Sequence, residues 1–206
     1  MTARRWALSC VCVLLAACGS DGRTLRPPEP GASAPPVQRS STTAAGQAAN
    51  TGAPGTATAF TVTSSAFEPG EPIPVVYTCD GNSVSPPLAW GSIPPGTVEL
   101  ALTVVDPDAN NFIHWAMAGI DPSAQAIGEG SVPDGVAQAK NSTNSTGWTG
   151  PCPPKGDPPH HYVFTLYALS APSGLTDGTD GRTAINTITQ HKVAAATLVG
   201  TYQRAS

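Results

Sequence analysis

Three of the four histidines in this chain lie in or beside apolar stretches, with aspartates nearby in the sequence. His114 lies within the segment FIHWAM, and His160 and His161 directly precede the segment YVFTLYAL. Asp106 and Asp108 follow the apolar run VELALTVV. A carboxylate can hold an imidazole N–H in place and raise its pKa, so that the ring donates a charge-assisted hydrogen bond to an anion. These residue types therefore indicate a functional site.

The same residues allow other interpretations. A histidine in a strand is most often a hydrogen-bonded structural residue, and two aspartates after a strand can simply cap a turn. Two aspartates and two histidines could hold a metal ion, and Cys152 could act as a nucleophile unless it is in a disulfide. The sequence contains no G-x-S-x-G, H-E-x-x-H or P-loop pattern. We therefore expect a binding protein with no catalytic residue, no metal and no cofactor.

Short apolar stretches separated by Gly- and Pro-rich turns predict strands around these residues. The strands are expected at 60–63, 75–78, 98–105, 112–120, 162–169 and 197–202. The nearly continuous apolar character of 98–105 suits a strand covered on both faces. One helix is expected at 182–196, with Thr179 or Asp180 as its cap. Several strands without βαβ alternation predict a mostly antiparallel β fold.

The N-terminal end has the layout of a bacterial lipoprotein signal. Arg4 and Arg5 precede an apolar run at 6–17, which is too short to span a bilayer of about 30 Å. The tetrapeptide LAAC ending at Cys18 resembles a lipobox, so we expect 1–17 to be a cleaved signal peptide and Cys18 to be acylated. Lipid on Cys18 would anchor the chain to a membrane of the cell envelope, facing outside the cytoplasm. The alternative is an ordinary signal peptide in which Cys18 is not acylated.

Residues 18–58 consist largely of Ala, Gly, Pro, Ser and Thr, without apolar periodicity or an aromatic residue. Such a segment buries too little surface to offset its ordering entropy, which predicts a disordered tether ahead of a folded domain at 59–206. Without Arg4 and Arg5, 8 of the 10 basic residues remain against 14 acidic ones, a net charge of −6. This acidic balance argues against nucleic acid as a partner.

Five cysteines are present, of which Cys10 and Cys12 would leave with the signal and Cys18 would carry lipid. The remaining Cys79 and Cys152 would lie in an oxidising compartment, so we expect a disulfide between them. The alternative is two buried free thiols that pack as small apolar residues.

Several ordered blocks between about residues 65 and 202 resemble the phosphatidylethanolamine-binding protein family, in particular its bacterial Raf-kinase-inhibitor-like branch. The blocks are YTCDGN at 77–82 with SPPL at 85–88, DPDA at 106–109, HW at 114–115, GPCPPKG at 150–156, HHYVFTLYAL at 160–169 and LVGTY at 198–202. The resemblance implies a mostly β fold with minor α content, in which a central antiparallel sheet packs on a second, smaller sheet. It places one or two helices near the C-terminus.

The resemblance also implies a small pocket for anions such as phosphate, phospholipid headgroups or carboxylates. Carried over by motif, its residues would be Asp106, Asp108, His114, Gly150, Pro151, His160 and Tyr162. The chain departs from the family pattern at Asn110, where proline is usual, and at His161, where arginine is usual.

Within this pocket we expect protonated or well-oriented His114 and His160 to donate to the anion, with Tyr162 adding its hydroxyl. Some members of the family inhibit proteases or kinase pathways through surfaces near the pocket. A protein partner that is inhibited or modulated in this way is therefore the alternative function.

Overall fold

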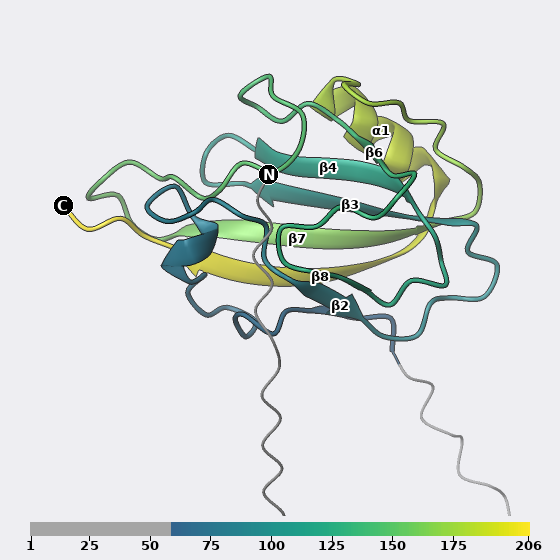
Figure 1. Ribbon diagram of the computed structural model, residues 1–206, viewed down its shortest axis with the longest axis horizontal. Helices are drawn as coiled ribbons and strands as arrows, with labels where there is room; N and C mark the ends of the chain where they lie inside the picture. The colour runs from purple at the N-terminus through teal and green to yellow at the C-terminus, as the bar shows by residue number, and fades with distance from the viewer. Residues whose placement is uncertain (1–58) are drawn as a thin grey trace, which may run out of the picture. The chain divides into compact units, whose positions relative to one another are not determined.

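The computed structural model describes residues 59–206, so the expected signal at 1–17, the anchor Cys18 and the tether up to residue 58 lie outside the described residues. The described chain forms two antiparallel sheets and one α-helix (Figure 1). This arrangement confirms the fold class expected from the sequence.

The larger sheet has five strands in the order β6-β4-β3-β7-β8, and every neighbouring pair is antiparallel. Its strands are β3 (Glu99–Asp106), β4 (Phe112–Ile120), β6 (Ala137–Gln138), β7 (His160–Leu169) and β8 (Lys192–Tyr202). β3 and β4 form a hairpin, and β7 lies against the other side of β3. The end of β3, the start of β4 and the start of β7 therefore meet at one end of the sheet.

The smaller sheet has three short strands in the order β1-β2-β5. They are β1 (Val62–Thr63), β2 (Leu88–Trp90) and β5 (Ala126–Ile127). Leu88, Trp90 and Ile127 are buried in the same apolar cluster as Leu100 and Leu102 of β3, so the smaller sheet packs on one face of the larger one. This packing forms the main core.

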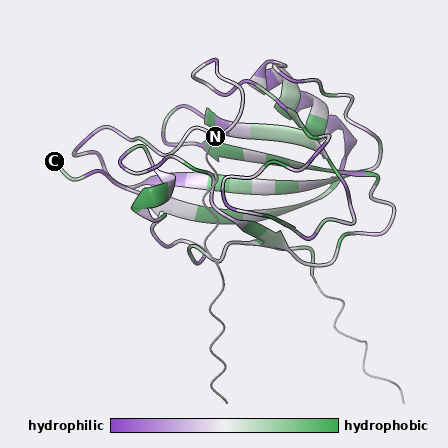
Figure 2. Ribbon diagram, viewed as in Figure 1, coloured by the Kyte–Doolittle hydropathy of each residue, from purple (hydrophilic) through white to green (hydrophobic). Residues whose placement is uncertain are grey.

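The helix α1 (Gly181–His191) covers the other face of the larger sheet. Its Ile188 packs with Ala101 of β3, Ala118 of β4 and Leu169 of β7. Figure 2 shows the apolar residues concentrated along the central strands. β3 is therefore covered on both faces, as its nearly continuous apolar sequence predicts. Among the described residues no helix is long and apolar enough to cross a bilayer.

The helix begins as expected and ends earlier. Oδ1 of Asp180 accepts a hydrogen bond from the N–H of Thr183 at 3.0 Å, which caps the first turn. The expected extension to residue 196 is wrong, because β8 starts at Lys192 and pairs with β7 from there to Tyr202. Alanines 194–196 favour helix when considered alone, but strand pairing with Ala168 and its neighbours overrides that preference.

The strand expected at 75–78 is also wrong. Val75–Tyr77 forms a single 3₁₀ turn (η1), in which the N–H of Tyr77 donates to the carbonyl of Pro74 and the N–H of Thr78 to that of Val75. Because the N–H groups of Tyr77 and Thr78 are used within the turn, they are not available for pairing with a second strand.

The outer edge of β8 is covered near its end by residues 70–73. The N–H of Gly70 donates to Val199 O at 2.7 Å, and the N–H of Ile73 donates to Thr201 O at 2.7 Å. This approach requires glycine at position 200, because a Cβ there would lie 2.6 Å from Cγ1 of Ile73. The segment therefore closes this part of the sheet edge.

Candidate functional site

A buried carboxylate–imidazole pair joins the end of β3 to the start of β7. The Nδ1–H of His160 donates to Oδ2 of Asp106 across 2.7 Å. Asp106 is 2% exposed and His160 is 9% exposed. Because Nδ1 of His160 is used in this bond, Nε2 is the ring nitrogen left for other contacts.

The other oxygen of Asp106 organises the loop that follows β3. Oδ1 accepts hydrogen bonds from the N–H groups of Asp108 at 2.8 Å and Ala109 at 3.1 Å. Together with His160, three donors therefore surround this one carboxylate, which spreads its charge over the loop and the ring.

The loop then reverses through two asparagines with left-handed backbone. Asn110 has φ of 55° and Asn111 has φ of 58°. Asparagine tolerates this conformation, whereas the ring of proline fixes φ near −65°. Asn110 therefore suits a left-handed turn that leads directly into β4. Proline, which is usual in the family at this position, would not.

His114 occupies an irregular position in β4. Val104 of β3 faces Trp115 and Val105 faces Ile113, so His114 is an extra residue between two successive pairs. Such a β-bulge re-aims a side chain. The ring of His114 lies edge-on to Tyr162, with ring centroids 5.1 Å apart.

Two hydrogen bonds attach His114 to Thr149. Nδ1–H of the ring donates to Thr149 O at 2.7 Å, and the N–H of Thr149 donates to His114 O at 3.0 Å. Burial lowers the pKa of His114 from its ordinary value, outweighing the hydrogen bond to Thr149 and the charge of Asp106, which raise it. The neutral ring therefore carries its proton on Nδ1 and presents Nε2 as an acceptor. This geometry differs from the expectation that His114 donates to an anion.

Tyr162 adds a hydroxyl beside these rings. The residue is fully buried, and its hydroxyl has no hydrogen-bond partner among the described residues. Burial, followed by the charges of Asp106 and Asp108, raises the pKa of Tyr162 well above its ordinary value. The group is therefore a neutral phenol whose O–H donor has no partner among the described residues.

These side chains line one pocket of about 150 Å³. The lining includes five of the residues expected from the sequence: Asp106, His114, Gly150, His160 and Tyr162. It also includes Ala109, Phe112, Thr143, Thr149, Cys152, Pro153 and Pro154. Phe112 could have been inferred from its position two residues before His114 in a predicted strand. Thr143 carries no sequence signal.

Asp108 and Pro151 are not among the residues that line the pocket. Asp108 is exposed, and its Oδ2 accepts hydrogen bonds from the backbone N–H of His161 at 2.7 Å and from its ring Nδ1 at 2.8 Å. These bonds lower the pKa of Asp108. His161 therefore forms an exposed pair with Asp108 beside the buried pair of His160 and Asp106.

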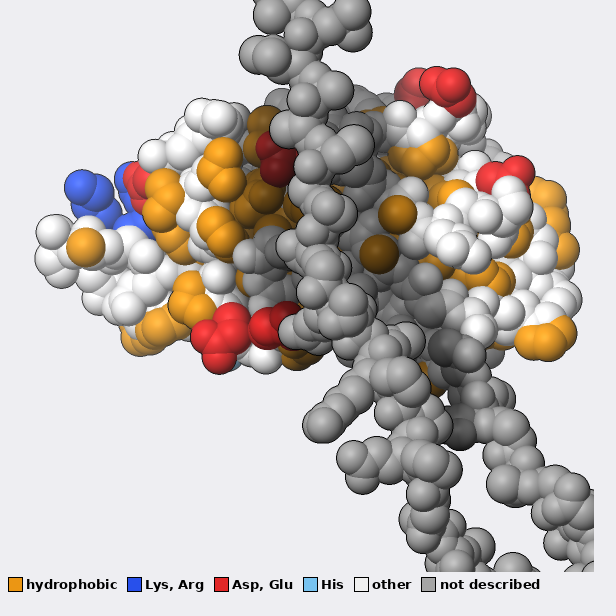
Figure 3. Space-filling model, turned by 60° about the horizontal axis from the view of Figure 1, so that its bottom comes forward, with side chains coloured by type: hydrophobic (Ala, Val, Ile, Leu, Met, Phe, Trp, Pro, Cys, Tyr) orange, Lys and Arg blue, Asp and Glu red, His pale blue; other side chains and the backbone are white. Residues whose placement is uncertain are grey.

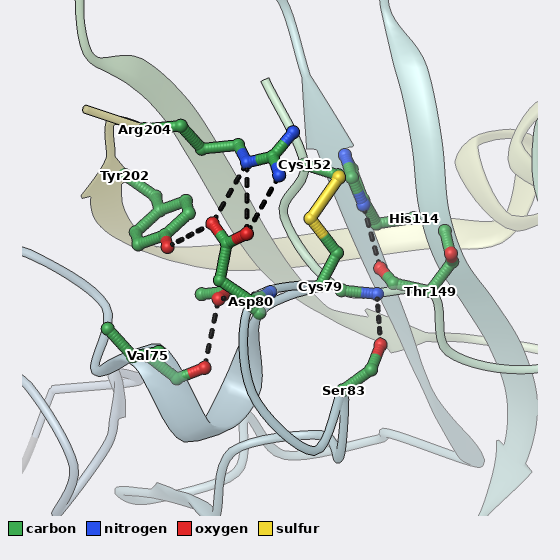
Figure 4. The surroundings of a disulfide bond; sticks show 11 residues. Val75, Cys79, Asp80, Ser83, His114, Thr149, Cys152, Tyr202 and Arg204 are labelled. Atoms are coloured by element: carbon green, nitrogen blue, oxygen red, sulfur yellow. Dashed lines mark hydrogen bonds and ion pairs between the residues drawn. A yellow bond between two sulfur atoms is a disulfide. The ribbon is translucent and has the colours of Figure 1, made fainter. Parts of the chain in front are cut away.

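One wall of the pocket is attached to the turn that follows η1. Cys152 is bonded to Cys79, with Cα atoms 5.4 Å apart, so the structure contains the expected disulfide. Figure 4 shows the disulfide beside His114 and Thr149. Both cysteines are exposed, unlike the buried thiols considered as the alternative. Pro151 contributes through its carbonyl, which accepts from the N–H of Cys79 at 3.0 Å.

Gly150 permits the close contact between this wall and the turn. Its N–H donates to Oγ of Ser83 at 3.0 Å, and a Cβ would lie 2.8 Å from Tyr77 O. Any larger residue would push the wall away from the turn. The glycine is therefore a structural requirement of the pocket.

Charge at the pocket is set by few groups. The described residues that line it include the acid Asp106 and two histidines, and neither lysine nor arginine. Arg204 instead forms an ion pair with Asp80, which also accepts from the hydroxyl of Tyr202 at 2.7 Å (Figure 4). On the face drawn in Figure 3, the Lys and Arg side chains gather at one end. Among the described residues, no three His, Cys, Asp or Glu side chains are placed to hold a metal ion.

Comparison with known proteins identifies a matching family. Residues 63–203 match the family described as phosphatidylethanolamine-binding protein. A Mycobacterium tuberculosis protein named as a candidate lipoprotein, LppC, is 40% identical over 193 residues, covering 93% of this chain and 90% of that protein.

Two solved structures share the fold. The crystal structure of Escherichia coli YbcL, described as a new member of the mammalian PEBP family, has a TM-score of 0.67 and 31% identity, covering 70% of this chain and 98% of that chain. The PEBP homologue CT736 from Chlamydia trachomatis has a TM-score of 0.66 and 33% identity, covering 71% of this chain and 98% of that chain. With both its sequence blocks and its two-sheet fold shared in this way, the chain belongs to the phosphatidylethanolamine-binding protein family.

Proposed function

We propose that this chain is an envelope lipoprotein whose folded domain binds a small anionic ligand in the pocket at the start of β7. The ligand is phosphate, a phospholipid headgroup or a carboxylate. The observation that carries the proposal is the hydroxyl of Tyr162, a buried donor without a partner in a pocket also lined by His114 and His160. A buried polar group without a partner is uncommon, and a ligand oxygen would satisfy it.

The size of the pocket limits the ligand. Its volume of about 150 Å³ corresponds to about five water molecules at roughly 30 Å³ each. A phosphate or a headgroup fits this space, whereas a whole acyl chain does not. The apolar side chains of Phe112, Pro153 and Pro154 would contact the carbon atoms of a ligand. Hydrogen bonds worth about 1.5–3 kcal/mol each between the ligand and polar groups of the pocket support an affinity between roughly millimolar and micromolar.

Calorimetric titration of the full-length chain in detergent micelles tests the proposal. The probes are inorganic phosphate, phosphoethanolamine and acetate. We expect saturable binding of at least one probe and a loss of about tenfold or more in affinity in Tyr162→Phe, because the variant removes the free donor. Tyr167→Phe is the matched control, since it makes the same change on the opposite face of β7. Absence of binding up to tens of millimolar for every probe would reject the function.

A second arm distinguishes free anions from lipid. Vesicles containing phosphatidylethanolamine or phosphatidic acid are added to the chain with phosphate already bound. Release of phosphate by vesicles, but not by vesicles of phosphatidylcholine alone, would identify a headgroup as the ligand. Retention of phosphate would identify a soluble anion.

The lipid anchor is supported by the lipobox ending at Cys18 and by the relative named as a candidate lipoprotein. That match extends over 193 residues, more than the described domain contains, and therefore includes part of the N-terminal segment. Metabolic labelling with radioactive palmitate should label the full-length chain and leave Cys18→Ser unlabelled. Cys12→Ser is the control, because that residue would leave with the signal. Equal labelling of wild type and Cys18→Ser would reject the anchor.

A further inference from the structure

A second cavity, of about 300 Å³, lies next along the chain to the wall of the anion pocket. Trp148 lines this cavity, and the residues that follow it, Thr149 and Gly150, line the anion pocket. The two cavities share no lining residue among those described. We call the second cavity the tryptophan groove, after Trp115 and Trp148 in its lining. Strands β4 and β6 and three loops contribute to it, so distant parts of the chain build the groove.

The tryptophan groove contains a hydroxyl that the protein leaves without a hydrogen bond. Ser85 is 4% exposed and lines the groove, and its Oγ makes no hydrogen bond with a described residue. The backbone carbonyl of Ser85 accepts from the N–H of Gly130 at 3.0 Å, which links two of the loops that line the groove. The hydroxyl is therefore held in place, and a ligand or a water molecule must satisfy it.

Two further polar side chains of the groove keep hydrogen-bond donors. The Nε1–H of Trp115 donates to Oε1 of Gln138 at 2.8 Å. Because an indole N–H can only donate, this bond fixes the orientation of the amide and leaves its Nε2 donors without a partner among the described residues. Oγ of Ser83 accepts from the N–H of Gly150 at 3.0 Å, so the proton of this hydroxyl remains for another acceptor.

The rest of the lining is apolar and uncharged. Trp148 is partly exposed, and Nε1, the only heteroatom of its side chain, is buried. The part of the ring that reaches the surface is therefore carbon, and the negative face of an aromatic ring attracts C–H groups. The described residues that line the groove include no acid, no lysine or arginine and no histidine. A charged ligand would find no opposite charge here.

We propose that the tryptophan groove binds a neutral sugar through one pyranose ring. A pyranose has a face of C–H groups, which packs on the carbon of Trp148, and hydroxyls that both donate and accept. These hydroxyls satisfy the Oγ of Ser85 and the Nε2 of Gln138. The volume corresponds to about ten water molecules at roughly 30 Å³ each, which is room for one ring. This site is separate from the anion pocket and does not depend on the function proposed above.

Indole resonances in NMR give the measurement. The methyl glycosides of glucose, galactose and mannose are titrated into the full-length, ¹⁵N-tryptophan-labelled chain, in a detergent whose headgroup contains neither sugar nor phosphate. We expect at least one glycoside to shift the Nε1–H resonance of Trp148 saturably, with an affinity in the roughly millimolar range. Trp148→Phe assigns that resonance. Trp90 is the internal control and should not move, since its Nε1 donates to Ala124 O at 2.7 Å outside the groove.

Ser85→Ala separates binding from structure. The lost hydroxyl has no partner among the described residues, so the thermal midpoint should not fall, whereas the affinity for the glycoside should fall about threefold to tenfold. Ser170→Ala is the matched control, because this exposed serine at the end of β7 lies outside the groove and should keep the affinity of the wild type.

Three outcomes would overturn the proposal. The first is no saturable shift with any glycoside up to tens of millimolar. The second is an equal affinity in Ser85→Ala and the wild type, or displacement of the glycoside by inorganic phosphate, since either would place the sugar elsewhere. The third is a capped alanine tripeptide that binds the groove as tightly as the glycosides. Calorimetry with phosphate alone tests the anion pocket separately, so failure of one site is distinguishable from failure of the other.

Discussion

Oδ2 of Asp106 and Nδ1 of His160 lie 2.7 Å apart and join the last residue of β3 to the first residue of β7. The two strands also pair along their lengths, from Glu99 with Leu169 to Val105 with Val163. The side-chain bond therefore continues the ladder beyond its last backbone pair, at the place where the ligand pocket opens.

Replacing the buried carboxylate should weaken both the fold and the site. Asp106→Asn places an amide N–H or an uncharged oxygen against His160 and weakens a charge-assisted bond, so we expect a loss of about 1–3 kcal/mol in the free energy of unfolding. Urea denaturation measures this loss. Asp108→Asn is the control, because its exposed pair with His161 should contribute less than about 1 kcal/mol. Equal losses in the two variants would contradict the assignment of Asp106 as the organising carboxylate.

The buried ring of His114 should make the fold sensitive to mild acid. Its folded-state pKa lies below the ordinary value of 6.5, because burial disfavours the charged ring. Between these two values the unfolded chain binds more protons, so stability falls as the pH decreases below about 6.5. The slope is at most about 1.4 kcal/mol per pH unit for one proton. Ring proton shifts in NMR should give a midpoint below 6.5.

Two variants check that this slope belongs to His114. Urea denaturation between pH 5 and 7 should show a smaller dependence on pH in His114→Gln than in the wild type. His191→Gln, at the end of α1, is the matched control, and an equal reduction in that variant would contradict the assignment to His114. An NMR midpoint for His114 above 6.5 would show that its environment favours the charged ring.

The loop between β3 and β4 should reject proline and accept glycine. Asn110 has φ of 55°, which proline cannot adopt and glycine adopts without strain. Asn110→Pro should therefore lower the free energy of unfolding by about 1–3 kcal/mol, and Asn110→Gly should change it by less than about 1 kcal/mol. Thermal denaturation of both variants measures the difference. A stable proline variant would mean that the loop does not require a left-handed residue here.

The disulfide should stabilise the fold and hold the pocket wall. It closes a loop with a sequence separation of 73 residues, for which the chain-entropy relation gives about 4 kcal/mol. The double variant Cys79→Ser/Cys152→Ser should lose about 2–5 kcal/mol in urea denaturation. Its affinity for phosphate should fall as well, because Cys152 lines the pocket. If reductant changed neither property of the wild type, the bond would be dispensable.

The sequence predicts the central strands well where the apolar pattern is long. The run at 112–120 is β4 to the residue, and 98–105 differs from β3 by one residue at each end. Prediction from the sequence fails where contacts with another part of the chain decide the secondary structure. Alanines 194–196 form a strand only because β7 offers a partner, and β5 and β6 are two residues long, too short to show a period.

Most residues of the site could be predicted from the sequence, but their hydrogen-bonding roles could be predicted only in part. His160 and Tyr162 are two apart in a strand and must share a face, so their common position follows from the sequence. Asp106 and Asp108 are also two apart, but Asp108 lies in a turn, where that alternation does not hold, and it pairs with His161 instead. The proton of His114 is fixed by a carbonyl 35 residues away, which no local pattern indicates.

The backbone of residues 70–73 occupies hydrogen-bonding groups of β8 at Val199 and Thr201. A free edge strand is a template on which a second polypeptide can add a strand, and proteins commonly block such edges. Here the blocking segment belongs to the same chain, so neighbouring copies find no unpaired backbone at these positions. A second copy therefore cannot add a strand to β8 along this stretch, and any contact between copies there must use side chains.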